Sequence, residues 1–221
     1  MSPRPRTVED AAILAATARA VGRLGPMRLT LADVAHEVGL TAAALVHRFG
    51  SRRGLLLAFA QQAPSMVDEC FVMVRAAHAS PLAALIAAAT DMAEHVRSPE
   101  ELVNSIAFLQ IDLSDEDFRK PALANSKQII AGYEALIRDA IDAGELVECD
   151  PRALARAIQA VTGGSLINWA IHREGRVAPF VRRDVETLLR PLIRAGQAAP
   201  RSSRRGARRA PRGRGDGRRA R

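Results

Sequence analysis

Aromatic residues are scarce in this chain of 221 residues: they make up 4% of it, although 48% of the residues are hydrophobic. The apolar content is enough for one or two buried cores, which must consist mainly of Leu, Ile, Val and Ala. No stretch alternates apolar and polar residues in the manner of a strand. We therefore expect an all-α protein of about nine helices.

Cysteine is nearly absent, with only Cys70 and Cys149, and no CxxC or mixed His/Cys spacing indicates a zinc site. We expect both to be reduced thiols. The five histidines form no HExxH pattern, and no serine stands in a GxSxG elbow. The acidic residues within 112–117 read as a turn and a solvated helix start. The sequence thus predicts no enzyme, no metal and no cofactor.

Long apolar runs are also missing. No run reaches the roughly 18 residues that a membrane span needs. The start MSPRPRTVEDAA lacks the apolar core of a signal peptide. We expect a cytoplasmic protein, associated with the nucleoid, that has no membrane partner.

Charge is distributed unevenly along the chain. The net charge is +8, but the last 21 residues alone hold ten arginines and one aspartate. Residues 1–60 hold 8 basic and 4 acidic residues, whereas residues 61–200 hold 14 basic and 19 acidic ones. Basic residues release counterions from DNA, so this asymmetry favours a DNA-binding domain joined to a body that does not bind DNA. From residue 197 the chain has too few apolar residues to fold, and we expect a disordered arginine-rich tail over 197–221.

Helix starts are marked by capping residues. Thr7 with Asp10 predicts a first helix that ends near Leu24, and Ser51 predicts a cap for a long helix to about residue 77. Pro64 is expected to break or kink that helix, as a mobile connector or as a fixed bend. Three caps are followed by proline, which predicts further helix starts at Ser80-Pro81, Ser98-Pro99 and Asp150-Pro151. The expected later segments are about 81–97, 99–112, 121–143, 151–174 and 178–196.

Two short helices joined by a sharp turn are predicted within TLADVAHEVGLTAAALVHRFGSRRGLL, residues 30–56. Thr30 and Asp33 have the spacing of a capping box, and Gly39 can adopt the left-handed conformation that ends a helix. Thr41 then caps a second helix whose Leu45 faces inward. The outer face is slim, so this helix could enter a major groove about 12 Å wide. The alternative is that residues 30–56 form an ordinary helical hairpin in an all-α enzyme.

The order and spacing of these residues resemble the amino-terminal domain of the TetR family of bacterial transcriptional regulators, over about residues 7–60. The motifs that carry the resemblance are Gly25, Thr30, Asp33, Ala35, Gly39-Leu40-Thr41, Phe49-Gly50-Ser51-Arg52 and Leu55-Leu56. Val46 stands where the family usually has a tyrosine that contacts a phosphate, so His47 or Arg48 is expected to make the backbone contact. The predicted DNA-binding residues are Thr30, Thr41, Ala42, Ala43, His47, Arg48 and Arg52.

The resemblance also implies a division into a helix-turn-helix domain over 1–60 and a helical bundle over 61–196. In such proteins the bundle binds a small molecule and forms a homodimer through its last two helices, here about 151–196. The sequence favours the dimer, because an apolar stripe of this size on the last helix would need a partner. The alternative is that the stripe packs wholly within one monomer. Its members are Val181, Val185, Leu188, Leu189, Leu192 and Ile193.

A cavity for a small, largely apolar effector is predicted around Trp169, because apolar surface mixed with a few polar groups suits such a site. The alternative is that Trp169 packs at the dimer interface with its indole N–H bonded to a neighbour. The predicted ligand-binding residues are Phe108, Gln110, Ser165, Asn168, Trp169 and His172.

The sequence therefore predicts a regulator, expected to be a repressor, that binds a double-stranded DNA operator and leaves it when an effector binds. The alternative function is a nucleoid-associated protein that binds any DNA through its basic tail. An all-α enzyme would need convergent acid and base groups in the body, and none is apparent.

Overall fold

The computed structural model describes residues 8–94 and 96–194, and within these ranges it contains nine α-helices and one short 3-10 helix. No strand occurs in this part of the chain; one isolated antiparallel bridge joins Leu146 to Ile193. The expectation of an all-α protein is confirmed. The predicted tail over 197–221 lies outside the described residues.

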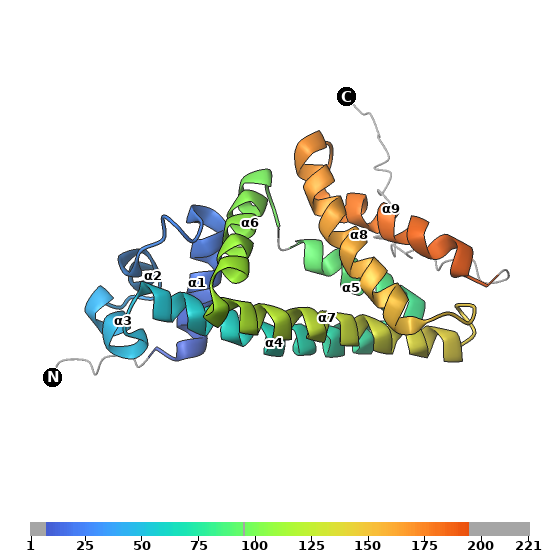
Figure 1. Cartoon of the computed structure of the whole chain (residues 1–221), viewed down its shortest axis with the longest axis horizontal. Coiled ribbons are helices and arrows are strands. Elements are labelled where there is room, and N and C mark those ends of the chain that lie inside the picture. The colour runs from blue at the N-terminus through green and yellow to red at the C-terminus, as the bar shows by residue number, and fades with distance from the viewer. Residues whose placement is uncertain (1–7, 95, 195–221) are drawn as a thin grey trace, which may run out of the picture.

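Three short helices gather at one end of the molecule and form what we call the headpiece, residues 8–60 (Figure 1). They are α1 (Asp10–Leu24), α2 (Leu31–Glu37) and α3 (Ala42–Phe49), and they pack on the first turns of α4 (Arg52–Ala77). The core between them is aliphatic apart from one ring, as the composition requires. Its buried members are Ile13, Ala16, Ala20, Val21, Leu29, Val34, Ala35, Leu45, Leu55, Leu56, Ala60 and Phe118.

The caps predicted at Thr30 and Ser51 are confirmed, whereas α1 begins at Asp10 with Glu9 at its N-cap and no side-chain cap, and Thr7 lies outside the described residues. Thr30 Oγ1 accepts a hydrogen bond from the Asp33 amide at 3.2 Å, and Asp33 Oδ2 accepts one from the Thr30 amide at 2.8 Å. The hydrogen bond from Thr30 also holds the pKa of Asp33 below its ordinary value. Ser51 Oγ accepts from the Gly54 amide at 3.0 Å. These bonds satisfy amides that have no partner inside their helix, and so they set the helix starts.

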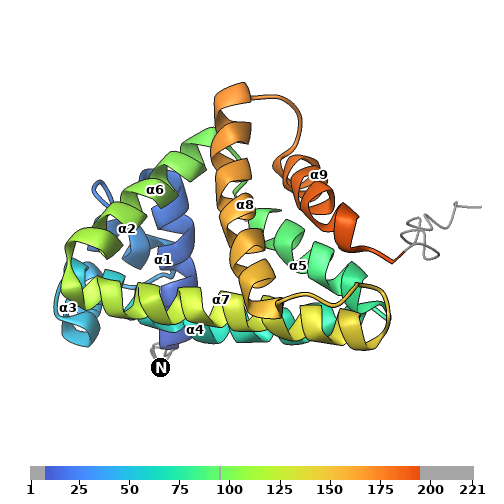
Figure 2. The same ribbon diagram turned by 45° about the vertical axis from the view of Figure 1, so that its right-hand side comes forward.

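Two long helices, α4 and α7 (Glu116–Asp142), run side by side along the length of the molecule (Figures 1 and 2). Phe71 of α4 packs edge to face on Tyr133 of α7, with ring centroids 5.2 Å apart. The helices approach closely at Gly132, where an added Cβ would lie 2.4 Å from the Phe71 ring. This pair connects the headpiece to the rest of the chain.

The helix α4 continues through Pro64, so of the two predicted outcomes the break is wrong and the kink stays a prediction. Proline removes one backbone donor and crowds the preceding turn. Buried Leu56, Ala60, Phe71 and Val74 lie on both sides of Pro64 and pack against neighbouring helices. We attribute the continuity to this tertiary packing, which outweighs the local cost.

The start of α7 also differs from the prediction, since the helix begins at Glu116 and not near Pro121. Asp115 caps it by accepting from the Asp117 amide at 3.0 Å. Phe118 in its first turn is 2% exposed and belongs to the headpiece core. The proline therefore lies inside the helix and does not begin it.

The body, residues 61–194, is completed by α5 (Pro81–Glu94), α6 (Pro99–Ser114), α8 (Pro151–His172), α9 (Val177–Leu189) and the 3-10 turn Arg190–Leu192. Its main core lies among α4, α5, α7, α8 and α9. The predicted starts at Pro81, Pro99 and Pro151 are confirmed. The predicted last segment, 178–196, is longer than the observed helix, which ends at Leu189 and is followed by the 3-10 turn.

Candidate nucleic-acid interface and ligand cavities

The second helix of the helix-turn-helix, α3, lies at the end of the molecule remote from α8 and α9 (Figure 1). Gly39 between α2 and α3 has φ +69°, the left-handed conformation that glycine adopts without strain. The amide of Leu40 donates to the Ala35 carbonyl at 2.8 Å, which closes the turn. Leu45 is fully buried and fixes the inner face of α3. The outer face is therefore held toward solvent.

Four of the predicted DNA-binding residues lie exposed on or beside α3: Thr41, Ala43, His47 and Arg48. Ala42 is half-buried. The Thr41 hydroxyl accepts from the Ala44 amide at 3.2 Å, so it caps α3 while remaining exposed. Thr30 is exposed too, but its hydroxyl is engaged in the capping box with Asp33. The surface that α3 offers is thus narrow and carries few long side chains.

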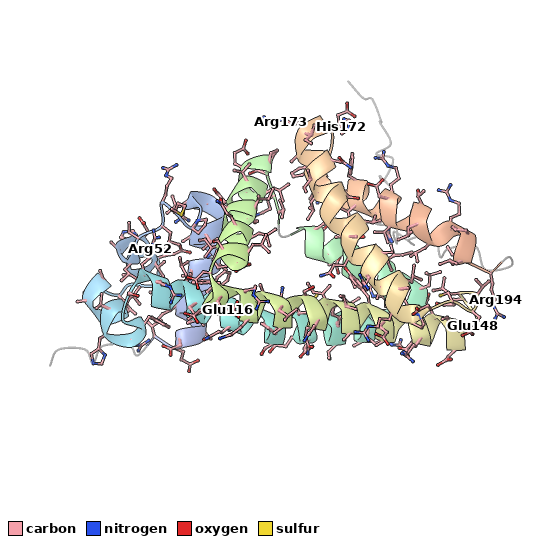
Figure 3. All side chains as sticks on the ribbon, viewed as in Figure 1. Arg52, Glu116, Glu148, His172, Arg173 and Arg194 are labelled. Carbon is pink, nitrogen blue, oxygen red and sulfur yellow. The ribbon has the colours of Figure 1, made fainter. Side chains whose placement is uncertain are left out.

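The two predicted arginines bond within the headpiece. Arg48 Nη1 donates to the Val8 carbonyl at 2.5 Å and to Asp10 Oδ1 at 3.2 Å. Arg52, at the start of α4 (Figure 3), donates through Nη1 to the carbonyls of Met27 at 2.9 Å and Leu29 at 3.4 Å. Arg52 therefore braces the loop between α1 and α2, and its role in DNA binding stays a prediction. Sequence spacing could not reveal these bonds, because the loop lies 23 to 25 residues earlier.

The headpiece is fastened to α6 and the start of α7 by contacts that the sequence did not predict. Arg53 Nη2 donates to Asp115 Oδ2 and to Asp117 Oδ2, both at 2.8 Å, and its guanidinium lies 5.4 Å from the centroid of Phe118. The bond from Arg53 lowers the pKa of Asp115. Asn104 Nδ2 donates to the Gly22 carbonyl at 2.7 Å. The two residues in each of these contacts are remote in sequence, so no local pattern could predict the contacts.

The six predicted ligand-binding residues do not line one cavity. Phe108 packs edge to face on Phe59, centroids 5.5 Å apart, and lines a cavity of about 390 Å³ beside α1. Gln110 is exposed. Two residues along a helix are about 200° apart around its axis, so Phe108 and Gln110 cannot share a face. The grouping predicted from sequence is corrected in this respect.

The four predicted residues of α8 also separate. Trp169 is 5% exposed, donates its indole N–H to the Gly175 carbonyl at 3.1 Å, and lines a different cavity of about 360 Å³. Ser165 is buried and donates to Asp184 Oδ2 at 2.7 Å, and together with Asn168 it lines a surface groove between α8 and α9. His172 is exposed at the outer end of α8 (Figure 3). The indole N–H of Trp169 is thus satisfied within its own chain, and packing of Trp169 at a dimer interface stays a prediction.

In the ranges 8–94 and 96–194, no three His, Cys, Asp or Glu residues are placed to hold a metal ion. Cys70 and Cys149 are free thiols, and burial raises the pKa of each. Asp112 is the one carboxyl there whose pKa is raised to about 6, by burial alone. No helix in the described part of the chain is both long and apolar enough to cross a membrane.

The fold and the placement of α3 define a helical protein with an amino-terminal helix-turn-helix and a separate helical body. Residues 13–59 match the family model of the bacterial regulatory proteins, tetR family. The amino-terminal domain is therefore that of the TetR family, and the chain as described has the fold of TetR-family transcriptional regulators. No curated protein matches the chain.

Solved structures of this fold span several organisms. A TetR regulator from Haloarcula marismortui is 19% identical, with a TM-score of 0.69, and the match covers 84% of this chain and 98% of that one. SmeT, the repressor of the Stenotrophomonas maltophilia multidrug efflux pump SmeDEF, is 20% identical, with a TM-score of 0.62 and coverage of 88% and 95%. FadR from Bacillus subtilis, solved with stearoyl-CoA, is 13% identical, with a TM-score of 0.64 and coverage of 81% and 97%.

Proposed function

We propose that the protein is a transcriptional repressor that binds its operator as a homodimer and leaves it when a small, largely apolar effector binds. The observation that carries this proposal is the exposed outer face of α3, with Thr41, Ala43 and His47, held by buried Leu45 at the end of the molecule away from α8 and α9. Short side chains let a helix approach base edges closely in the major groove. Residues 1–60 carry the basic charge that supports binding to phosphates.

A homodimer through α8 and α9 is supported by the surface between these helices. A groove of about 420 Å³ lies there, lined by Val161, Gly164, Ser165, Asn168, Asp184, Thr187 and Leu188. A Cβ added at Gly163 or Gly164 would meet no atom within 4 Å, so this side of α8 is open to a second chain. Two copies joined here would present two α3 helices, and the dimer must hold them about 34–36 Å apart for successive major grooves.

Of the predicted stripe, Leu188 lines this groove and most of the other members on α9 do not. Val181, Val185 and Leu189 are fully buried inside the monomer, against α5 and α8. The alternative of packing within one monomer therefore applies to most of the stripe on α9. The spacing of apolar residues identifies an apolar helix face, but it does not show whether that face packs inside its own bundle or against a second chain. The sequence therefore left both arrangements open.

The effector is proposed to occupy the cavity beside Trp169. Its walls come from the ends of α5 and α8 and from the start of α9. The lining combines apolar and charged residues: Val96, Trp169, Val177 and Ala178 with Glu94, Arg97 and Arg176. The apolar part of this lining favours an apolar ligand. FadR, a protein of the same fold, was solved with stearoyl-CoA, which supports an effector with a hydrocarbon part. A ligand can release DNA only if it binds the DNA-free conformation more tightly.

The experiment is selection of genomic DNA fragments by the purified full-length chain, repeated with residues 201–221 removed. The proposal expects both proteins to enrich the same inverted-repeat sequence. If neither protein enriches any sequence, and binding depends on the tail, the protein is a non-specific binder and the proposed function is wrong. Ala43→Glu serves as the negative control in the same selection.

A further inference from the structure

A cavity of about 390 Å³ lies where the headpiece meets the body, and the proposed function does not use it. The helices α1 and α6 pack against each other there (Figure 2). One wall belongs to α1, with Ala18, Val21 and Gly22, and another to α6, with Ser105 and Phe108; Phe59 of α4 adds its ring. The volume falls within the range of about 300–1,000 Å³ that is usual for small-molecule sites.

The inner part of this cavity is apolar. Phe59 and Phe108 meet edge to face, at an interplanar angle of 89°, and Val21 is 6% exposed beside them. Aromatic rings in this arrangement offer an edge and a face to a third ring, or a flat surface to a branched alkyl group. Such a lining favours an occupant with an aromatic or branched aliphatic body.

The mouth of the cavity is polar and carries arginines. A second hollow, of about 480 Å³, shares Arg19, Gly22, Arg97 and Glu101 with the first and adds Arg23, Ser98 and Glu100. The side chains of Arg19 and Arg97 are 54% and 74% exposed. Among the described residues, Arg19 bonds to Glu37 and Arg97 to Glu101 through Nε alone. The remaining N–H groups of each guanidinium can bind an anion.

Two acidic residues lie at the mouth, Glu100 and Glu101, and the carboxylate of Glu101 is bonded within the fold. Glu101 Oε2 accepts from the Arg97 amide at 2.8 Å, and the Glu101 amide donates to Ser98 Oγ at 3.2 Å. Ser98 caps α6, and Glu101 reaches one residue further back than a capping box would, to the amide of Arg97. Glu101 Oε1 also lies 3.5 Å from Arg97 Nε, so Glu101 fixes the backbone and one edge of the guanidinium of Arg97, and a ligand would meet its Nη groups.

We propose that this cavity binds a small amphipathic acid, with an aromatic or branched aliphatic body against Phe59 and Phe108 and a carboxylate near Arg97 and Arg19. The site is distinct from the cavity beside Trp169, although Val96 and Arg97 contribute to the walls of both. Its occupant would contact headpiece and body together. The inference goes beyond the proposed function and does not depend on it.

The test uses 2-naphthoate as the probe and the full-length protein without DNA, with binding measured by calorimetry. Gly22 permits a sharp block, because a Cβ added there would meet no atom within 4 Å and a longer side chain can grow into the cavity. Gly22→Leu should weaken 2-naphthoate binding at least tenfold, and Gly22→Ala, the matched control, should leave it within about twofold. Circular dichroism of both variants checks that the helices are intact.

The anionic part is tested with methyl 2-naphthoate, which has the same rings and no charge. It should bind the wild-type protein at least fivefold more weakly than 2-naphthoate, and Arg97→Gln should reduce this preference to less than twofold. Equal binding of the ester and the acid would overturn the assignment of an acid. Unchanged 2-naphthoate binding in Gly22→Leu would overturn the site itself. The assay contains no DNA, so either failure leaves the proposed function standing.

Discussion

The close approach of α4 and α7 at Gly132 makes a sharp prediction about stability. A Cβ on Gly132 would lie 2.4 to 2.5 Å from three atoms of the Phe71 ring, whereas a Cβ on Gly22, also inside a helix, would meet nothing within 4 Å. Replacing a helical glycine with alanine ordinarily stabilises a helix by about 1 kcal/mol. The two substitutions should therefore differ in sign.

The magnitude at Gly132 follows from the surroundings of Phe71. That ring is 9% exposed and packs on Tyr133 at 5.2 Å, so it cannot move aside into solvent. Overpacking of a core costs about 1–3 kcal/mol. After subtraction of the helix gain of about 1 kcal/mol, Gly132→Ala should lower the free energy of unfolding by up to about 2 kcal/mol. Gly22→Ala should raise it by up to about 1 kcal/mol.

The assay is urea unfolding followed by circular dichroism, with the midpoint and slope compared for the two variants and the wild type. A double variant, Gly132→Ala with Phe71→Leu, should be less destabilised than the two single changes added together, because the smaller side chain leaves room for the new methyl group. A Gly132→Ala protein as stable as the wild type, or more stable, would refute the close contact on which this reasoning depends.

Three further predictions concern charge. Ala43→Glu should abolish binding to the selected operator, because the new carboxylate would be repelled by the DNA phosphates. The fold should stay intact, because a carboxylate in the first turn of α3 interacts favourably with the helix dipole. Anisotropy titration of the operator measures the loss, with Ala76→Glu at an exposed position as the control. Removing residues 201–221, which hold ten arginines, should weaken binding to random DNA and flatten its salt dependence more than it alters sequence preference. Burial raises the pKa of Asp112 to about 6, so stability should fall as pH rises from ~4, the unfolded value, to about 6. Asp112→Asn should lack that fall in urea midpoints, and an identical pH profile in the variant would contradict the assignment.

The sequence by itself determined the features that depend on neighbouring residues. Thr30 with Asp33, Ser98 with Glu101, and Asp150 before Pro151 mark helix starts because a side chain three or four positions away can satisfy an exposed amide. The left-handed Gly39 and the inward Leu45 are local in the same sense. These residues were sufficient to predict the helix-turn-helix and the family resemblance, and both are confirmed.

Only the tertiary structure decided which side chains meet across the fold. Phe118 lies in the headpiece core although it is about 60 residues beyond the headpiece boundary, and that burial, together with the Asp115 cap, accompanies the earlier start of α7. Arg52 donates to the carbonyls of Met27 and Leu29 because the loop before α2 folds back against the start of α4. Phe108 and Trp169 both belong to cavity walls, but to walls of different cavities. Periodicity identifies an apolar face, whereas the partner of that face depends on how distant helices pack.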